Sequence, residues 1–137
     1  MYGNQIIVVH GEDRTGTLYT TIYKHLDKRS VAAGDTVRRG QQVGTLGTTG
    51  LLSQGYPHLH FELWTKPRGR VSDPQDPNNY WVNGAGKVTC FAAGRRYPSA
   101  PDKLTYPVVC PATAGSNATA TFVRAGSHIF AEHIGRV

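Results

Sequence analysis

Long hydrophobic runs, methionine and cysteine are scarce in this sequence. The apolar run near its start, residues 5–9, is far too short to cross a membrane, and no transmembrane segment is expected anywhere. The same run is too short for the core of a signal peptide and lacks a positive flank, so no secretion signal is expected in this chain. The 137 residues contain one methionine and two cysteines, which permit at most one intramolecular disulfide.

Acidic residues are also few. Nine Asp and Glu stand against fifteen Lys and Arg, which gives a formal net charge of +6. Such a charge predicts attraction to a polyanion: a nucleic acid, an anionic membrane or a bacterial cell wall. The basic residues are scattered apart from short pairs such as Arg38-Arg39 and Arg95-Arg96, with no basic helix and no alternating basic and aromatic stripe. This distribution argues against a nucleic-acid-binding protein.

What is abundant favours β-structure. The chain has 16 Gly and 8 Pro, and Thr, Val and Tyr recur throughout, which is typical of short strands joined by turns. No helix is expected. With 39% hydrophobic and 18% charged residues, the chain has the composition of one globular domain. We therefore predict a mostly β protein with an antiparallel sheet.

The first eighty residues carry the clearest strand signals. A strand over residues 4–10, a turn over 11–16 and a strand over 17–26 predict a hairpin. Alternation places Tyr19, Thr21, Tyr23 and His25 on one face of the second strand. Further strands are expected over residues 43–46 and 58–64, with a Gly-rich loop between them. His10 is interpreted as a solvated residue at the end of its strand.

The last third is less regular. Residues 88–91 and 104–110 are candidate strands, residues 111–121 resemble a linker, and residues 121–137 receive no assignment. Cys90 and Cys110 form either one disulfide or two buried free thiols. A disulfide closing a loop of this size stabilises a protein by roughly 3 kcal/mol and suits a periplasmic or extracellular location.

The chemistry concentrates in the segment His58-Leu59-His60-Phe61-Glu62-Leu63. On a strand, His58, His60 and Glu62 share one face, and the apolar residues between them share the other. Two histidines held in this way on a rigid sheet suit a metal site. Glu62 either supports that site or faces solvent. Trp64, Tyr80 and Trp81 are interpreted as core or edge aromatics rather than a sugar-binding platform.

At this point the ordered motifs resemble the core of the M23 zinc peptidases, the lysostaphin and LytM type. The resemblance runs from Tyr2 to about Tyr80. It includes Tyr23-Lys24-His25-Leu26, the Gly-punctuated segment over residues 31–44, Gly47-Thr-Thr-Gly, the His-Leu-His-Phe-Glu segment and Asp73-Pro74. It implies a duplicated, hybrid-motif-like antiparallel sheet with Gly-rich loops forming a groove, a partial peptidase core at residues 1–80 and an irregular extension at residues 81–137.

The resemblance also implies residue roles. His60 is expected to bind Zn²⁺, and His25 and His58 are expected to orient or deprotonate the attacking water and to stabilise the oxyanion. Tyr23, Thr49 and Tyr56 are the candidates for the substrate groove. The implied activity is hydrolysis of peptide cross-links in bacterial peptidoglycan by a monomeric protein outside the cytoplasm, extracellular or periplasmic.

One departure from the family pattern is concrete. M23 enzymes carry an upstream His-x3-Asp segment that supplies two further zinc ligands, and this sequence has no counterpart of it. His128 and His133 are five residues apart without a following Asp, so they do not match the missing segment. The expectation is an incomplete metal site. Either the chain is a fragment of a longer enzyme, which its abrupt start favours, or a second chain supplies the ligands, or the domain is degenerate.

Two alternatives remain. A catalytically inactive LytM-like domain would act as a cell-wall binding or hydrolase-activating module, although the retained histidines argue against it. A lipoyl-like carrier would use the hairpin motif over residues 31–47. That class needs a lysine in the following turn, and residues 47–57 contain none.

Overall fold

A computed structural model of the chain describes residues 4–47, 59–108, 110, 122–124 and 129–136. Its centre is the predicted hairpin, in which β1 (Asn4–Glu12) pairs antiparallel with β2 (Leu18–Arg29). The carboxylate of Asp13 closes the turn by accepting hydrogen bonds from the backbone N–H groups of Thr15 and Thr17 at 2.8 and 3.1 Å. The turn and the alternating strands together fix the register of the hairpin.

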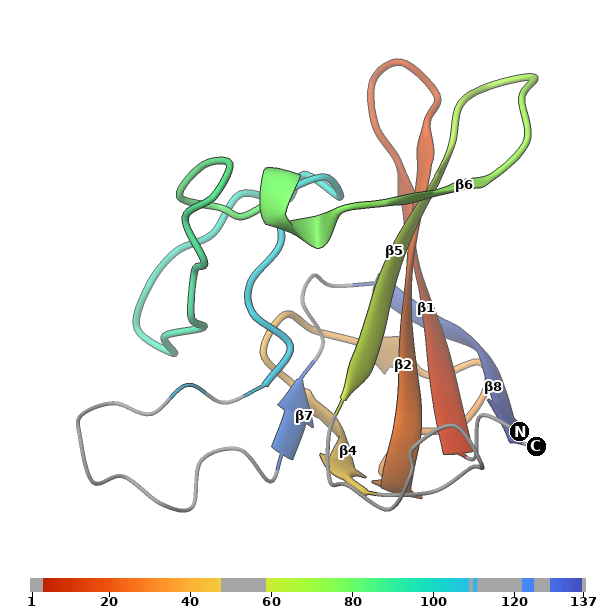
Figure 1. The fold of residues 1–137 in the computed structure, drawn as a ribbon, viewed down its shortest axis with the longest axis vertical. Coiled ribbons are helices and arrows are strands. Elements are labelled where there is room, and N and C mark those ends of the chain that lie inside the picture. Colours follow the sequence, from red (N-terminus) through yellow and green to blue (C-terminus); the bar gives the residue numbers. More distant parts are fainter. Residues whose placement is uncertain (1–3, 48–58, 109, 111–121, 125–128, 137) are drawn as a thin grey trace.

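The other strands extend this hairpin into one sheet (Figure 1). They are β3 (Thr36–Val37), β4 (Gln42–Leu46), β5 (His60–Lys66), β6 (Asp73–Gln75), β7 (Phe122–Arg124) and β8 (Ile129–Arg136). The order is β3-β8-β1-β2-β4-β7; β5 also pairs with β2, and β6 with β5. All the strand pairs are antiparallel, and the described residues contain one short 3-10 turn, η2 (Pro77–Asn79). The predicted mostly β, antiparallel fold is confirmed.

Alternation along β2 builds the core, as predicted for its first part. Tyr19, Thr21 and Tyr23 are buried, whereas the residues between them are only partly so. Around Tyr23 gather the buried side chains of one cluster: Ile6, Val8, Leu26, Val37, Val43 and Val123. A second cluster of Tyr19, Leu63, Trp81 and Leu104 continues the same core toward the C-terminal part of the chain.

The interpretation of His10 as a solvated strand end was wrong. Strand β1 continues to Glu12, so His10 lies inside the strand on its core face and is fully buried. Its Nε2 lies 2.6 Å from Thr21 Oγ1, and the Thr21 hydroxyl donates to Tyr23 Oη at 3.0 Å. Hydrogen bonding of this kind is what permits a polar group inside a core.

The C-terminal part differs from its prediction in two ways. The described residues of 88–91 and 104–110 form no strand; they take part only in isolated bridges, at Leu104 and Val108. The unassigned end instead supplies β7, which pairs with β4, and β8, which pairs with β1 and β3. Strands β7 and β8 therefore complete the main sheet, although they lie far in sequence from the strands with which they pair. The division into domains at residue 80 stays a prediction.

A disulfide lies within residues 81–110, and Arg39 connects this segment to the sheet. Cys90 and Cys110 form a disulfide, which decides between the two predicted alternatives. From the turn between β3 and β4, the Arg39 guanidinium donates to the carbonyl oxygens of Lys103 and Pro98 at 2.8 and 3.2 Å. It also lies 5.1 Å from the ring centroid of Tyr97, a cation–π contact. Arg39 therefore joins the irregular segment to the sheet.

Candidate active site

Two of the three predicted catalytic and metal residues lie in the described part of the chain. His60 begins β5, and its backbone pairs with Lys24 on β2. His25 follows Lys24, and its ring centroid lies 5.8 Å from that of His60, with the rings nearly perpendicular. The third residue, His58, and the groove candidates Thr49 and Tyr56 lie outside the described residues.

His25 reaches His60 through a break in the alternation of β2. Opposite β1, the pairing steps from Ile6 with Tyr23 to Asn4 with Leu26, which leaves one extra residue on β2. His25 sits in this bulge with a φ of 66°, and it is the sole described residue other than glycine with positive φ. Bulges next to active sites redirect side chains, and a non-glycine residue in the left-handed region is uncommon. Simple alternation would have placed His25 with Tyr23 on the core side.

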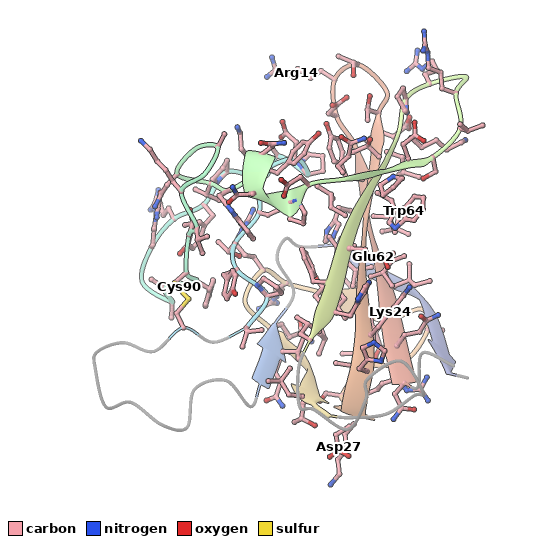
Figure 2. All side chains as sticks on the ribbon, viewed as in Figure 1. Arg14, Lys24, Asp27, Glu62, Trp64 and Cys90 are labelled. Atoms are coloured by element: carbon pink, nitrogen blue, oxygen red, sulfur yellow. A yellow bond between two sulfur atoms is a disulfide. The ribbon has the colours of Figure 1, made fainter. Side chains whose placement is uncertain are left out.

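The outward face of β5 carries a polar cluster centred on Glu62 (Figure 2). Glu62 Oε2 accepts from Lys24 Nζ at 2.9 Å and lies 2.6 Å from His60 Nε2. Its other oxygen, Oε1, accepts from Trp64 Nε1 at 2.8 Å. Of the two predicted alternatives for Glu62, support of the histidine site or exposure to solvent, the structure favours the first, because the carboxylate contacts His60.

The environment of Glu62 keeps it ionised. Its partial burial raises the pKa, but the hydrogen bonds from Trp64, Lys24 and His60 outweigh that effect and lower the pKa from 4.5 to about 2. The Lys24 and Glu62 side chains are 11% and 23% exposed, whereas the side chain of His60 is 47% exposed. The partly buried Glu62 carboxylate therefore contacts the more exposed imidazole of His60.

Lys24 and Trp64 were not among the predicted site residues. Trp64 shares a face with His60 and Glu62 by strand alternation, a signal that the sequence did contain. Lys24 lies on a different strand, and its position across from His60 depends on the β2–β5 register, which no local pattern reveals.

Tyr23, predicted to line the substrate groove, is fully buried in the core. Its ring packs edge-on against Phe61 at 5.2 Å between centroids, on the side of the sheet opposite the Lys24–Glu62 pair. Strand alternation is the reason, because residues 22 and 24 take the outward face.

A hollow of about 270 Å³ adjoins the same strand on its other side. Leu59 and Phe61 of the β5 segment form one wall, and Trp81 and Tyr106 form another. A larger hollow of about 550 Å³ lies between the β1–β2 turn and residues 99–102, at the far end of the hairpin from His60. Neither of these two hollows is lined by His25 or His60.

The described residues do not make a complete zinc site by themselves. A catalytic zinc usually has three protein ligands and a water, and no group of three His, Cys, Asp or Glu in the described ranges is placed to hold a metal. His60 fits one ligand position, since zinc-binding histidines commonly give their second ring nitrogen to a carboxylate, as His60 does to Glu62.

Comparison with known proteins gives a consistent result. Residues 1–77 match "Peptidase family M23". The chain is 42% identical over 97 residues to the peptidoglycan DD-endopeptidase ShyC of Vibrio cholerae, which covers 69% of the chain and 20% of ShyC. It is 41% identical over 66 residues to ShyB of the same species, covering 48% of the chain and 14% of ShyB.

A third relative is named for a different role. The murein hydrolase activator NlpD of Salmonella dublin is 39% identical over 73 residues, which cover 53% of the chain and 17% of that protein. The chain thus spans one-fifth or less of the length of these three relatives. No solved structure matches it significantly. Within the described residues, no helix is long and apolar enough to cross a membrane.

Proposed function

Because this chain belongs to peptidase family M23, we propose that it is part of a zinc-dependent endopeptidase that hydrolyses peptide cross-links of bacterial peptidoglycan. The observation that carries the proposal is the bulge on β2, which sets His25 5.8 Å from His60 between ring centroids. A strained residue next to a metal-binding type of histidine is characteristic of a working site rather than of a structural one. The names of the ShyB and ShyC relatives support this substrate class.

In this proposal the histidines divide the work. His60 is the metal ligand, supported by Glu62, and His25 and His58 orient or deprotonate the attacking water and stabilise the oxyanion. Neutral imidazoles exchange protons near pH 7, which suits them to that task. Zinc, when bound, lowers the pKa of its water and polarises the scissile carbonyl. The remaining zinc ligands come from outside the described residues.

Charge and redox chemistry are consistent with the cell envelope as the location. The net charge of +6 favours retention on an anionic wall. The Cys90–Cys110 disulfide is stable in an oxidising compartment, so we propose a periplasmic or extracellular location for a monomeric protein. We also retain the proposed division into a partial peptidase core at residues 1–80 and an extension after it.

A second function is favoured by one finding, the similarity to a protein named as a murein hydrolase activator. In that case the chain would bind a partner hydrolase or the wall without cutting peptides. The two functions differ in whether the histidines are needed.

The deciding experiment measures zinc content and peptide release from purified peptidoglycan with one preparation of the longer protein that includes the remaining zinc ligands. After zinc reconstitution and dialysis, an enzyme retains about one zinc per chain and releases new amino termini, and His60→Ala loses both. His128→Ala and His133→Ala serve as controls that test whether the C-terminal histidines contribute. If no preparation retains zinc or cuts peptidoglycan, yet the chain stimulates a separate wall hydrolase equally with and without His60, the activator role replaces the peptidase role.

A further inference from the structure

One carboxylate on β5 serves three donors. Glu62 Oε2 receives both Lys24 Nζ at 2.9 Å and His60 Nε2 at 2.6 Å, and Oε1 receives Trp64 Nε1 at 2.8 Å. An ammonium and an indole N–H are donors only, and an ionised carboxylate is an acceptor only. The short contact to His60 is therefore a hydrogen bond only if Nε2 carries the proton.

We propose that Glu62 is a positioning residue that holds His60 in the Nε2–H tautomer and leaves Nδ1 as the nitrogen with the lone pair. The inference rests on the proposed function only in taking His60 as a residue of the active site. It assigns the reactive atom of that residue: a metal ion or a proton meets His60 at Nδ1, not at Nε2.

Lys24 and Trp64 give this arrangement its rigidity. Lys24 pairs across the strands with His60, and Trp64 lies two residues beyond Glu62 on the same face, so the carboxylate is held from both sides. Because both partners only donate, neither can exchange roles with the imidazole. A carboxylate free to rotate would orient the imidazole less well, since supporting groups must be fixed to position a reactive residue.

The substitution Glu62→Gln tests the proposal through a simple count of acceptors. Glutamine keeps the shape but offers one carbonyl oxygen to three donors and turns an NH₂ group toward one of them. If the amide NH₂ faces His60 Nε2–H, two donors meet. The clash is removed if Nε2 loses its proton and accepts from the amide, with the proton moved to Nδ1. The variant is thus expected to gain the Nδ1–H tautomer, whereas Trp64→Phe, which removes a donor and keeps the anion, is expected to retain the wild-type tautomer.

The measurement is ¹⁵N NMR of the full chain labelled at histidine, at a pH where His60 is neutral, with His60→Asn used to assign its signals. In the wild type, the Nε2–H form should exceed the Nδ1–H form by about tenfold or more, the ratio that a charge-assisted hydrogen bond supports. Wild-type ¹⁵N shifts that report equal populations of the two forms, or an excess of the Nδ1–H form, overturn the proposal without any variant. Retention of the full ratio in folded Glu62→Gln also overturns it, because another group then sets the tautomer. None of these results depends on zinc content or peptide hydrolysis, so the proposed function stands or falls separately.

Discussion

The buried contact between β1 and β2 allows a sharp test of how polar groups stabilise this core. Thr21 is fully buried, and its hydroxyl lies between His10 Nε2 at 2.6 Å and Tyr23 Oη at 3.0 Å. Thr21→Val keeps the shape and the β-branch but deletes the hydroxyl. Two buried hydrogen bonds at about 1 kcal/mol each give an expected loss of about 2 kcal/mol in the free energy of unfolding. For a chain of 137 residues, that loss lowers Tm by roughly 7 °C.

The neighbouring residue provides a matched control. Thr20 lies on the opposite face of β2, is only half-buried, and pairs with Val9 and Trp64. Thr20→Val makes the same chemical change away from the core and should alter stability by less than about 0.5 kcal/mol. Thermal unfolding followed by circular dichroism measures both variants. If Thr21→Val costs no more than Thr20→Val, the hydrogen bonds contribute no net stability and the reasoning fails.

Three further predictions follow from contacts described above. The double substitution Cys90→Ser with Cys110→Ser should cost about 3 kcal/mol in urea unfolding, and adding a reductant should lower only the stability of the wild type. The hydrogen bonds that Asp13 accepts, chiefly from the Thr15 hydroxyl, lower its pKa from 3.8 to about 2. The contribution of ionised Asp13 to stability is therefore complete above about pH 4 and is lost as the pH falls toward 2. The Tm of Asp13→Asn should therefore fall less than that of the wild type across this range; parallel curves would contradict this. Arg39→Lys keeps the charge but loses the planar guanidinium that contacts Pro98, Lys103 and Tyr97. Limited proteolysis should therefore cleave residues 81–110 of the variant several-fold faster than those of the wild type. Equal rates would show that Arg39 does not hold this segment.

Local pattern was sufficient for the elements that depend on neighbours in sequence. The turn over residues 11–16 and the alternation of Tyr19, Thr21 and Tyr23 predicted the central hairpin, and the face shared by His60 and Glu62 followed from strand periodicity. The His25 bulge left no such signal, because histidine in the left-handed region is set by the pairing of β1 with β2 rather than by its own propensity.

Long-range pairing explains the other differences. The sequence of residues 129–136 did not predict strand β8, because its partners β1 and β3 lie about a hundred residues earlier. His10 was assigned to solvent because the predicted strand ended at residue 10, yet β1 continues past Gly11. The contact between Lys24 and Glu62 could not be predicted without the register of β2 and β5. Each of these depends on tertiary structure, which overrides local preference.

The place of β8 in the sheet has a consequence for biosynthesis. This strand lies between β3 and β1, and residues 30–128 separate it from the end of β2. At about 5–20 residues per second, a ribosome exposes β8 roughly 5 to 20 s after β2. During that interval one edge of β1 has no β8 to pair with, and exposed edges invite pairing with other chains. Export of the nascent chain before it folds, or a chaperone bound to β1, would protect this edge until β8 has been synthesised.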